Sequence, residues 1–126
     1  MKRKNIEIML GFLDAIRRRD RQAAAEFLDP AVVWRGVVPG IVCRTPGEVL
    51  DVFLGERGRE LEIDRLEVIG TDRGAVFAVH GPETWEIEGV ELRGAIYHAV
   101  AIDGDRITRL EDHAELEQAC TAAAAT

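Results

Sequence analysis

The sequence reads DGDRITRLEDH at residues 103–113, where a turn dipeptide runs into a patterned strand. Asp103-Gly104 is a typical turn, and the residues after it alternate as those of a strand with two unlike faces do. One face carries side chains that water tolerates and the other is mostly apolar: Ile107, Arg109, Glu111 and His113 against Thr108, Leu110, Asp112 and Ala114. The alternation therefore predicts a core-facing surface that contains one carboxylate, that of Asp112.

The segments before this strand are strand-like as well. AVFAVHGPETWEI (residues 75–87) and VELRGAIYHAVAI (residues 90–102) flank Glu88-Gly89, which predicts a tight hairpin, and Gly81-Pro82 interrupts the first of them. Further upstream, ELEIDRLEVIG changes its alternation near Arg65, which predicts a bulge and hence a bend in the sheet. The second half of the chain therefore predicts a long antiparallel meander.

The first half is helical. Asp20 suits the N-cap of a short second helix that runs through Phe27 and stops at Asp29-Pro30, and AVVWRGVVPG (residues 31–40) reads as a short strand running into a loop. Before Asp20, residues 5–18 predict a first helix, because apolar residues recur there at helical spacing: Met9, Phe12, Leu13 and Ile16.

A third helix is marked by its first residues. Thr45-Pro46-Gly47-Glu48 is a capping box with proline at the first helical position, so two side chains satisfy backbone N–H groups that the helix leaves unpaired. The inward face of this helix is predicted to carry Val49, Leu50, Val52 and Phe53. Because the helices come first and the strands second, the expected fold class is α+β, not a parallel α/β fold.

Composition excludes several classes of protein. The 126 residues suffice for one domain with a real core, and a net charge of −7 argues against nucleic-acid binding. No apolar run approaches the ~20 residues of a membrane span, and the basic start has helical periodicity, unlike a signal peptide.

Cys43 and Cys120 lie far apart, which favours a reducing compartment and predicts a cytoplasmic protein. The sequence contains no serine, which excludes serine nucleophiles.

This order of elements, together with DPAVVWRGVVPG, TPGEVLDVF and DGDRITRLEDH, resembles the SnoaL-like branch of the nuclear-transport-factor-2-like superfamily over residues 5–117. The resemblance implies a single domain over residues 1–126. The final alanine-rich segment by itself predicts a helix that frays into a disordered tail over residues 118–126. It implies a cone-shaped, curved mixed sheet wrapped around three helices of the N-terminal half, with an internal apolar pocket. It also implies a homodimer formed through the outer face of the sheet. The superfamily includes ketosteroid isomerases, epoxide hydrolases, polyketide cyclases and noncatalytic binding proteins, so the fold alone does not fix the function.

The resemblance carries over to the site only in part. Asp112 falls where the epoxide hydrolases have a water-activating aspartate and where SnoaL-type cyclases have their base. The hydrolases' Arg-x-Asp falls near His80-Gly81-Pro82 and is missing. The isomerases' tyrosine aligns with Phe12, their base aspartate falls at or beside Arg35, and their second oxyanion acid aligns with His98. Because no complete set is present, the resemblance implies neither an isomerase nor an epoxide hydrolase.

Asp112 and His98 are the candidate catalytic residues. A buried carboxylate needs a partner, so Asp112 is either an acid or base in a pocket or a strand-end aspartate near solvent that caps the following segment. His98 shares a face with Ile96 and Val100, and it is either a proton carrier or a satisfied core histidine. If the last two strands pair around Gly104, both residues face the same cavity, where a histidine–carboxylate pair can move protons near neutral pH.

Five further residues are predicted to contact substrate: Phe12, Trp34, Phe53, His80 and Leu110. For the apolar ones, a place in the core is the alternative. Pairing outward from the Glu88-Gly89 turn puts His80 opposite Tyr97, away from His98, unless a bulge at Gly81-Pro82 reverses it. Local spacing supports no metal site, and no cofactor motif is present. Cys43 is a loop thiol without a neighbouring base, which argues against a nucleophile.

The sequence thus predicts a cofactor-independent enzyme that acts on a small, mostly apolar metabolite by general acid–base chemistry. Isomerisation, cyclisation and water addition suit such a site, whereas epoxide hydrolysis suits it less because the arginine–aspartate pair is absent. Two alternatives stay open. The same pocket would hold a hydrophobic ligand without chemistry, or the pocket would be filled by side chains and the dimer face would recruit a partner protein.

Overall fold

The computed structural model describes residues 2–36, 40, 42–55, 67–87 and 90–124. For residues 79–87 and 90–95 it describes the backbone only. Its elements, in chain order, are α1 (Lys2–Arg17), α2 (Arg21–Glu26), β1 (Leu28–Arg35), β2 (Val42–Cys43), α3 (Pro46–Leu54), β3 (Val68–Gly70), β4 (Gly74–Ile87), β5 (Val90–Asp103), β6 (Arg106–His113) and α5 (Leu116–Ala124).

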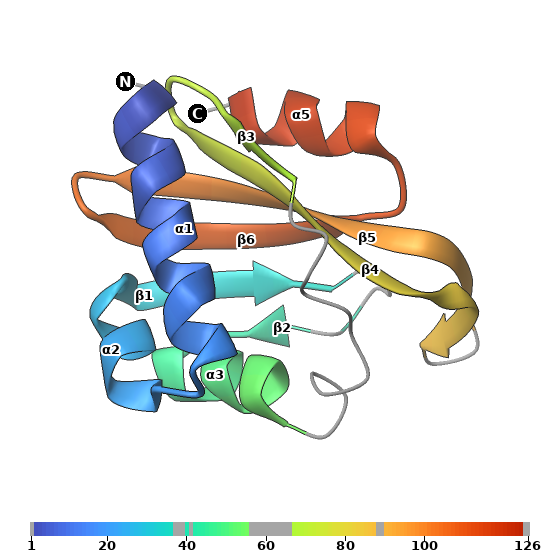
Figure 1. Ribbon diagram of the computed structural model, residues 1–126, viewed down its shortest axis with the longest axis horizontal. Coiled ribbons are helices and arrows are strands. Elements are labelled where there is room, and N and C mark those ends of the chain that lie inside the picture. The colour runs from blue at the N-terminus through green and yellow to red at the C-terminus, as the bar shows by residue number, and fades with distance from the viewer. Residues whose placement is uncertain (1, 37–39, 41, 56–66, 88–89, 125–126) are drawn as a thin grey trace.

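One curved sheet of six strands organises these elements (Figure 1). The strand order is β2-β1-β6-β5-β4-β3, in which β1 runs parallel to β6 and every other pair is antiparallel. The predicted α+β class and mixed sheet are therefore confirmed. The parallel contact inserts a strand of the first half beside the last strand of the chain, which joins the two halves of the sequence in one sheet.

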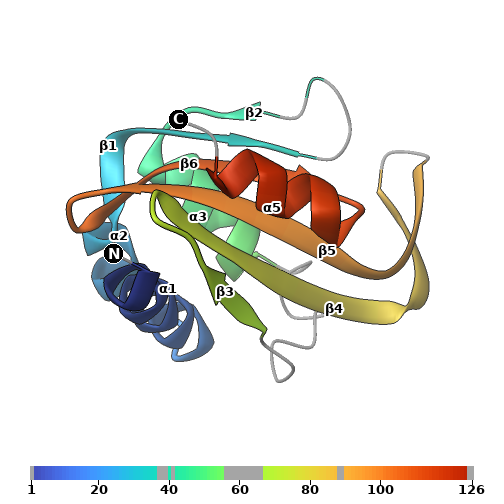
Figure 2. The same cartoon turned by 90° about the horizontal axis from the view of Figure 1, so that it is seen from above.

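Helices cover both faces of the sheet. α1, α2 and α3 lie against one face, where their apolar residues form a single buried cluster with Phe77, Val100 and Leu110 of the strands. α5 lies on the opposite face and packs against Val76 and Ala99 (Figure 2). Alternate residues of β4 and β5 thus face different helices, as the two-residue period of a strand requires.

The helix starts follow the predicted capping chemistry. The carboxylate of Asp20 accepts a hydrogen bond from the backbone N–H of Ala23 at 3.1 Å, which caps α2. Thr45 Oγ1 accepts from the N–H of Glu48 at 3.1 Å, while the Glu48 carboxylate accepts from the N–H of Arg44 at 3.2 Å and not from that of Thr45. The reciprocal arm of the capping box therefore reaches one residue further back than predicted.

Two helix predictions need correction. Val52 was predicted to face inward from α3, but its side chain is exposed, whereas Val49, Leu50 and Phe53 are buried. α2 ends at Glu26, and Asp29-Pro30 lies inside β1 and does not terminate the helix. Proline is tolerated there because it lies near the start of the strand, where the β1–β6 pairing is irregular between Leu28 and Val33.

A bulge in β6 overturns the predicted alternation of that strand. Ile102 pairs with Ile107 and Ala101 pairs with Arg109, so Thr108 is an extra residue with no partner in β5. The Thr108 hydroxyl donates a hydrogen bond to the Ala101 carbonyl at 3.3 Å. Because of this extra residue, Ile107 turns inward and is fully buried together with Leu110, although it was predicted on the water-facing side.

β4 continues through Gly81-Pro82 and is not interrupted there. The ladder with β5 changes register between His80 and Thr84, where a bulge at Gly81-Pro82 was the stated alternative, so His80 pairs with Ala95 and not with Tyr97. Ile87 pairs with Val90 on either side of the predicted hairpin turn. The turn itself, residues 88–89, and the bulge predicted near Arg65 lie outside the described residues.

The alanine-rich C-terminal segment forms a helix, as predicted, which is α5 and ends at Ala124. Ala119 and Ala123 of α5 are buried against the sheet. The hydroxyl of Thr71 donates to the Ala123 carbonyl at 3.1 Å, and the Thr71 carbonyl accepts from the Asn5 amide at 2.9 Å. Thr71 therefore connects α5 to α1. None of the helices within the described ranges has the length and apolar character that crossing a membrane requires.

Candidate functional site

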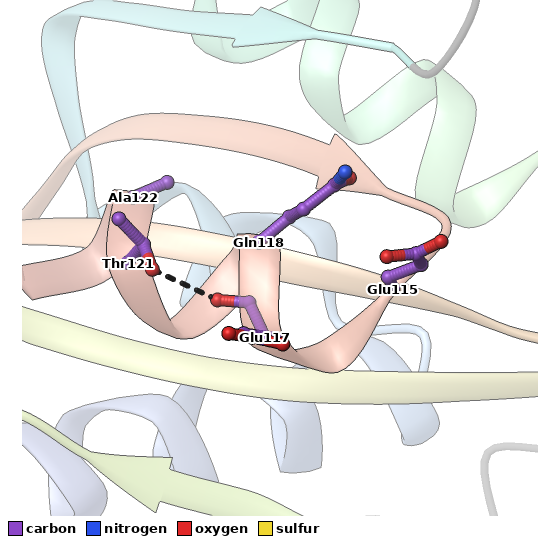
Figure 3. Close-up of a pocket in the computed structure, with 5 residues that line it drawn as sticks. All are labelled: Glu115, Glu117, Gln118, Thr121 and Ala122. Atoms are coloured by element: carbon purple, nitrogen blue, oxygen red, sulfur yellow. Dashed lines mark hydrogen bonds between the residues drawn. The ribbon is translucent and has the colours of Figure 1, made fainter.

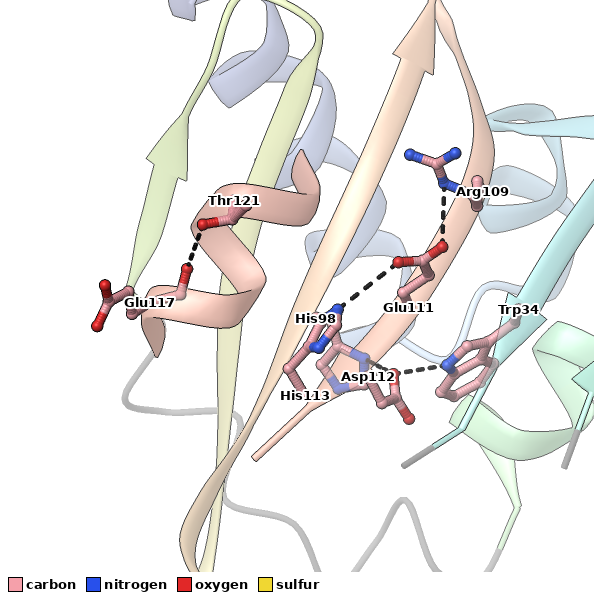
Figure 4. Close-up of polar contacts among 8 residues, drawn as sticks. All are labelled: Trp34, His98, Arg109, Glu111, Asp112, His113, Glu117 and Thr121. Carbon is pink, nitrogen blue, oxygen red and sulfur yellow. Dashed lines mark hydrogen bonds and ion pairs between the residues drawn. The ribbon is translucent and has the colours of Figure 1, made fainter. Parts of the chain in front are cut away.

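Three adjacent strands bring Trp34, His98 and Asp112 together (Figure 4). His98 of β5 lies directly opposite Asp112 of β6 in the antiparallel ladder. Trp34 of β1 pairs with Leu110, two residues before Asp112 on the same strand. Directly opposed residues place their side chains on one face of a sheet, so the predicted meeting of His98 and Asp112 occurs.

The bulge at Thr108 sets this pairing. From the Asp103–Arg106 pair at the turn, a regular ladder would place Glu111 opposite His98. The extra residue advances the register by one, which brings Asp112 to that position and places Glu111 opposite Ala99 on the other face. The local irregularity of β6 therefore selects which carboxylate enters the site.

The Asp112 carboxylate lies between two nitrogen atoms. Its Oδ1 accepts a hydrogen bond from Trp34 Nε1 at 2.6 Å, and the same oxygen lies 2.6 Å from His98 Nδ1. The side chains of His98 and Asp112 are only 5% and 8% exposed. The histidine contact is at ion-pair distance, but the ring nitrogen has no aligned hydrogen bond. Asp112 thus contacts strands β1 and β5 instead of capping the segment that follows it.

Aromatic rings surround the histidine. His98 stacks on Phe77, its partner in β4, with ring centroids 4.4 Å apart and an interplanar angle of 13°. Trp34 and Phe53 contact it at 5.7 and 6.0 Å, and these two rings stack on each other at 4.7 Å and 16°. Charges in such apolar surroundings interact more strongly than they would in water.

Comparison of the sequence with family models and with curated proteins gives no match. Solved structures do match the fold. Bal32a, from a soil-derived mobile gene cassette, aligns over 89% of both chains with a TM-score of 0.67 and 16% identity. An NTF2-like protein from Burkholderia xenovorans aligns over 98% of both chains, with a TM-score of 0.64 and 15% identity.

A proposed polyketide cyclase from Pseudomonas putida aligns over 90% of this chain and 92% of its own, with a TM-score of 0.60 and 16% identity. The chain has the NTF2-like fold. At these identities the likeness establishes the architecture and leaves the reaction open, because NTF2-like domains carry different chemistries on one scaffold. The predicted resemblance is confirmed at that level.

The apolar residues predicted to contact substrate lie inside this NTF2-like cone. Phe12 of α1 is fully buried and contacts Phe53 edge-on at 5.6 Å. Leu110 of β6 is also fully buried, opposite Val100. Phe53 and Trp34 touch the histidine ring, whereas Phe12 lies one ring further away. The side chain of His80 lies outside the described residues.

Cys43 lies beside the site, but not in a loop as predicted. It forms β2 with Val42, pairs with Trp34 and is buried. Burial raises the pKa of its thiol, and the negative charges of Glu48, Asp112 and Asp51 raise this pKa further. A thiol that holds its proton in this way is a poor nucleophile at neutral pH.

A second polar row lies on the other face of β6. Glu111 Oε1 is 3.5 Å from Arg109 Nε, and its Oε2 is 3.6 Å from His113 Nε2. The His113 side chain is 24% exposed, so it is partly buried, although it was predicted to be solvated.

A hollow of about 530 Å³ lies along the surface of α5 (Figure 3). It is lined by Glu115, Glu117, Gln118, Thr121 and Ala122.

Sequence reasoning found two members of the site and missed how the third belongs to it. Trp34 was predicted to contact substrate, whereas its indole N–H binds Asp112. The two residues are 78 positions apart and meet through a parallel strand pair, which no local pattern reveals. Among the described residues, no group of three potential metal ligands lies close together.

Proposed function

We propose that this NTF2-like protein binds a small, mostly apolar molecule and transfers protons with Asp112 and His98, without a cofactor. The observation that carries this proposal is the contact of 2.6 Å between Asp112 Oδ1 and His98 Nδ1 among aromatic rings. The solved polyketide cyclase-type relatives give the fold a precedent for small-molecule chemistry. An internal pocket beside this pair, lined by Trp34 and Phe53, belongs to the proposal.

The chemistry that suits the pair is proton abstraction next to a carbonyl group. The Asp112 carboxylate takes a proton from the carbon atom, and the C–H electron pair forms a carbon–carbon double bond as the carbonyl π pair moves to oxygen. Protonated His98 donates a hydrogen bond to that developing negative charge. Return of the proton to the same carbon gives exchange, and return to another carbon gives isomerisation. Attack of the carbanion on a second carbonyl within the molecule gives cyclisation.

Hydrogen exchange of a simple ketone tests the proposal without knowledge of the natural substrate. The probe is 2-tetralone, a fused bicyclic ketone with acidic C–H groups beside its carbonyl. In deuterium oxide, the protein should speed up loss of the probe's proton NMR signals at these positions. Asp112→Asn should lower the exchange rate at least tenfold, because the amide keeps the shape of the carboxylate and cannot accept the proton.

Asp105→Asn is the matched control for this substitution. Asp105 lies in the turn of the same hairpin, where its exposed carboxylate pairs with Lys4 at 2.9 Å, so its loss should leave exchange unchanged. Circular dichroism would confirm that both variants fold. Equal exchange rates for Asp112→Asn and the wild type would remove the assignment of Asp112 as the base.

A noncatalytic binding protein is the second candidate. The stacking of His98 on Phe77 and the near-complete burial of the pair favour it, because a histidine that packs in the core beside a carboxylate has the same surroundings. In that case, 2-tetralone or larger apolar ketones would shift NMR signals around Trp34 while the protein speeds up no exchange. The proposed homodimer and cytoplasmic location accompany either function.

A further inference from the structure

We propose that Trp34 is a positioning residue that fixes the Asp112 carboxylate and leaves Oδ2 as the oxygen that exchanges a proton. The inference rests on the proposed function of Asp112 and His98. It adds a third residue to the pair and distinguishes between the two oxygens of the carboxylate.

The indole ring of Trp34 is held from several sides. Trp34 is paired with Cys43 of β2 on one side and with Leu110 of β6 on the other. Its ring stacks on Phe53 at 4.7 Å, and the residue is only 6% exposed. A side chain confined in this way presents its single N–H group in one fixed direction.

That N–H group makes the aligned contact to the carboxylate. Trp34 Nε1 donates to Oδ1 of Asp112 at 2.6 Å, whereas His98 Nδ1 lies equally close to the same oxygen without an aligned hydrogen bond. The indole therefore holds the carboxylate through its hydrogen bond, and the imidazole lies beside the same oxygen without one. Figure 4 shows the second oxygen of Asp112 pointing away from both nitrogen atoms. Because Oδ1 is occupied, the proton is exchanged at Oδ2.

The positioning role makes a prediction that a purely structural role does not. A hydrogen bond to the charged form of an acid favours that form. Trp34→Phe keeps an aromatic ring against Phe53 and removes the N–H donor together with part of the ring volume. The midpoint of the Asp112 titration, followed by carbon-13 NMR of its side-chain carboxyl, should move to higher pH. The acid limb of the 2-tetralone exchange profile should move with it.

Phe27→Leu is the control for general loosening of the core. Phe27 packs edge-on against Phe12 at 6.4 Å, in the same apolar cluster but without contact to the carboxylate. This variant should lower stability and leave the Asp112 midpoint where it is. An unchanged midpoint in Trp34→Phe would overturn the positioning role, even if Asp112→Asn still abolished exchange. Failure of the proposed function would show differently, as exchange that Asp112→Asn does not affect.

The wild-type protein supplies a second measurement that does not depend on whether Trp34→Phe folds. The proton NMR signal of the Trp34 indole N–H should change position with pH, with the same midpoint as the Asp112 carboxyl. An indole signal that stays constant while Asp112 titrates would overturn the inference.

Discussion

Asp112 shows how a carboxylate is accommodated in an apolar cluster. Its burial would be costly without partners, and the structure supplies an indole N–H and an imidazole at the same oxygen. Neither partner is a permanent cation, in contrast to the arginine that the epoxide hydrolases place near their aspartate.

Cys43 gives a prediction about pH at the same scale. Burial raises the pKa of its thiol in the folded protein, so the folded state holds this proton more tightly than the unfolded state does. The resulting stabilisation is present below the unfolded pKa and is lost as pH rises through the folded one. Above about pH 9, the free energy of unfolding of the wild type should therefore fall more steeply than that of Cys43→Ala.

Urea denaturation across this pH range measures the difference in slope. Cys120→Ala, at the other cysteine, serves as the control and should keep the wild-type slope. Parallel curves for the wild type and Cys43→Ala would show that the thiol does not carry the effect.

At the scale of elements, local chemistry was predictable and long-range pairing was not. Asp20 and Thr45 mark helix starts because a cap needs only residues three positions apart. The pairing of β1 with β6 depends on segments more than 70 residues apart, and the bulge at Thr108 depends on the ladder with β5. The candidate pair was predicted because His98 and Asp112 each lie on an apolar face of neighbouring strands, whereas the bulge that sets them opposite each other and the Trp34 hydrogen bond were not predictable.

α5 carries a prediction of its own. Ala123 is 1% exposed against the sheet, and Ala124 beside it is exposed. Ala123→Glu would force a charge into the contact between helix and sheet, so it should lower the free energy of unfolding by about 2–4 kcal/mol or detach the helix. Ala124→Glu adds the same charge on the exposed side and should change stability by less than about 0.5 kcal/mol.

Urea denaturation and circular dichroism compare the two α5 variants. Equal stabilities would mean that α5 does not pack on the sheet in solution. The position of this helix also bears on the proposed dimer, because α5 covers Val76 and Ala99 on the outer face through which this chain was predicted to dimerise. A dimer through this face must include α5 or use the neighbouring row of Arg109, Glu111 and His113.

For the whole molecule, the sheet order predicts cooperative unfolding. β1 belongs to the N-terminal half and pairs with β6 near the C-terminus, and helices α1–α3 share one apolar cluster with β4, β5 and β6. Neither half can therefore lose its structure without exposing the core of the other. Unfolding by urea should be a single transition.

Trp34 provides a local probe for this test. In Trp85→Phe it is the only tryptophan of the chain, so its fluorescence reports the site while circular dichroism reports the helices. The two transitions should coincide. A fluorescence change at lower urea than the loss of helix signal would reveal a site that opens before the rest of the fold.

The bulge at Thr108 has a consequence for comparing sequences. A protein with the same hairpin and no bulge would pair the equivalents of His98 and Asp112 with one residue fewer between them. An alignment must therefore open a gap of one position in β6. Without that gap, Glu111 is aligned with the site aspartate of the other protein. The alignment then places the Glu111 carboxylate in the interior, although it lies on the outer face of the sheet. For the same reason, deletion of one residue near position 108 would keep His98 opposite Asp112.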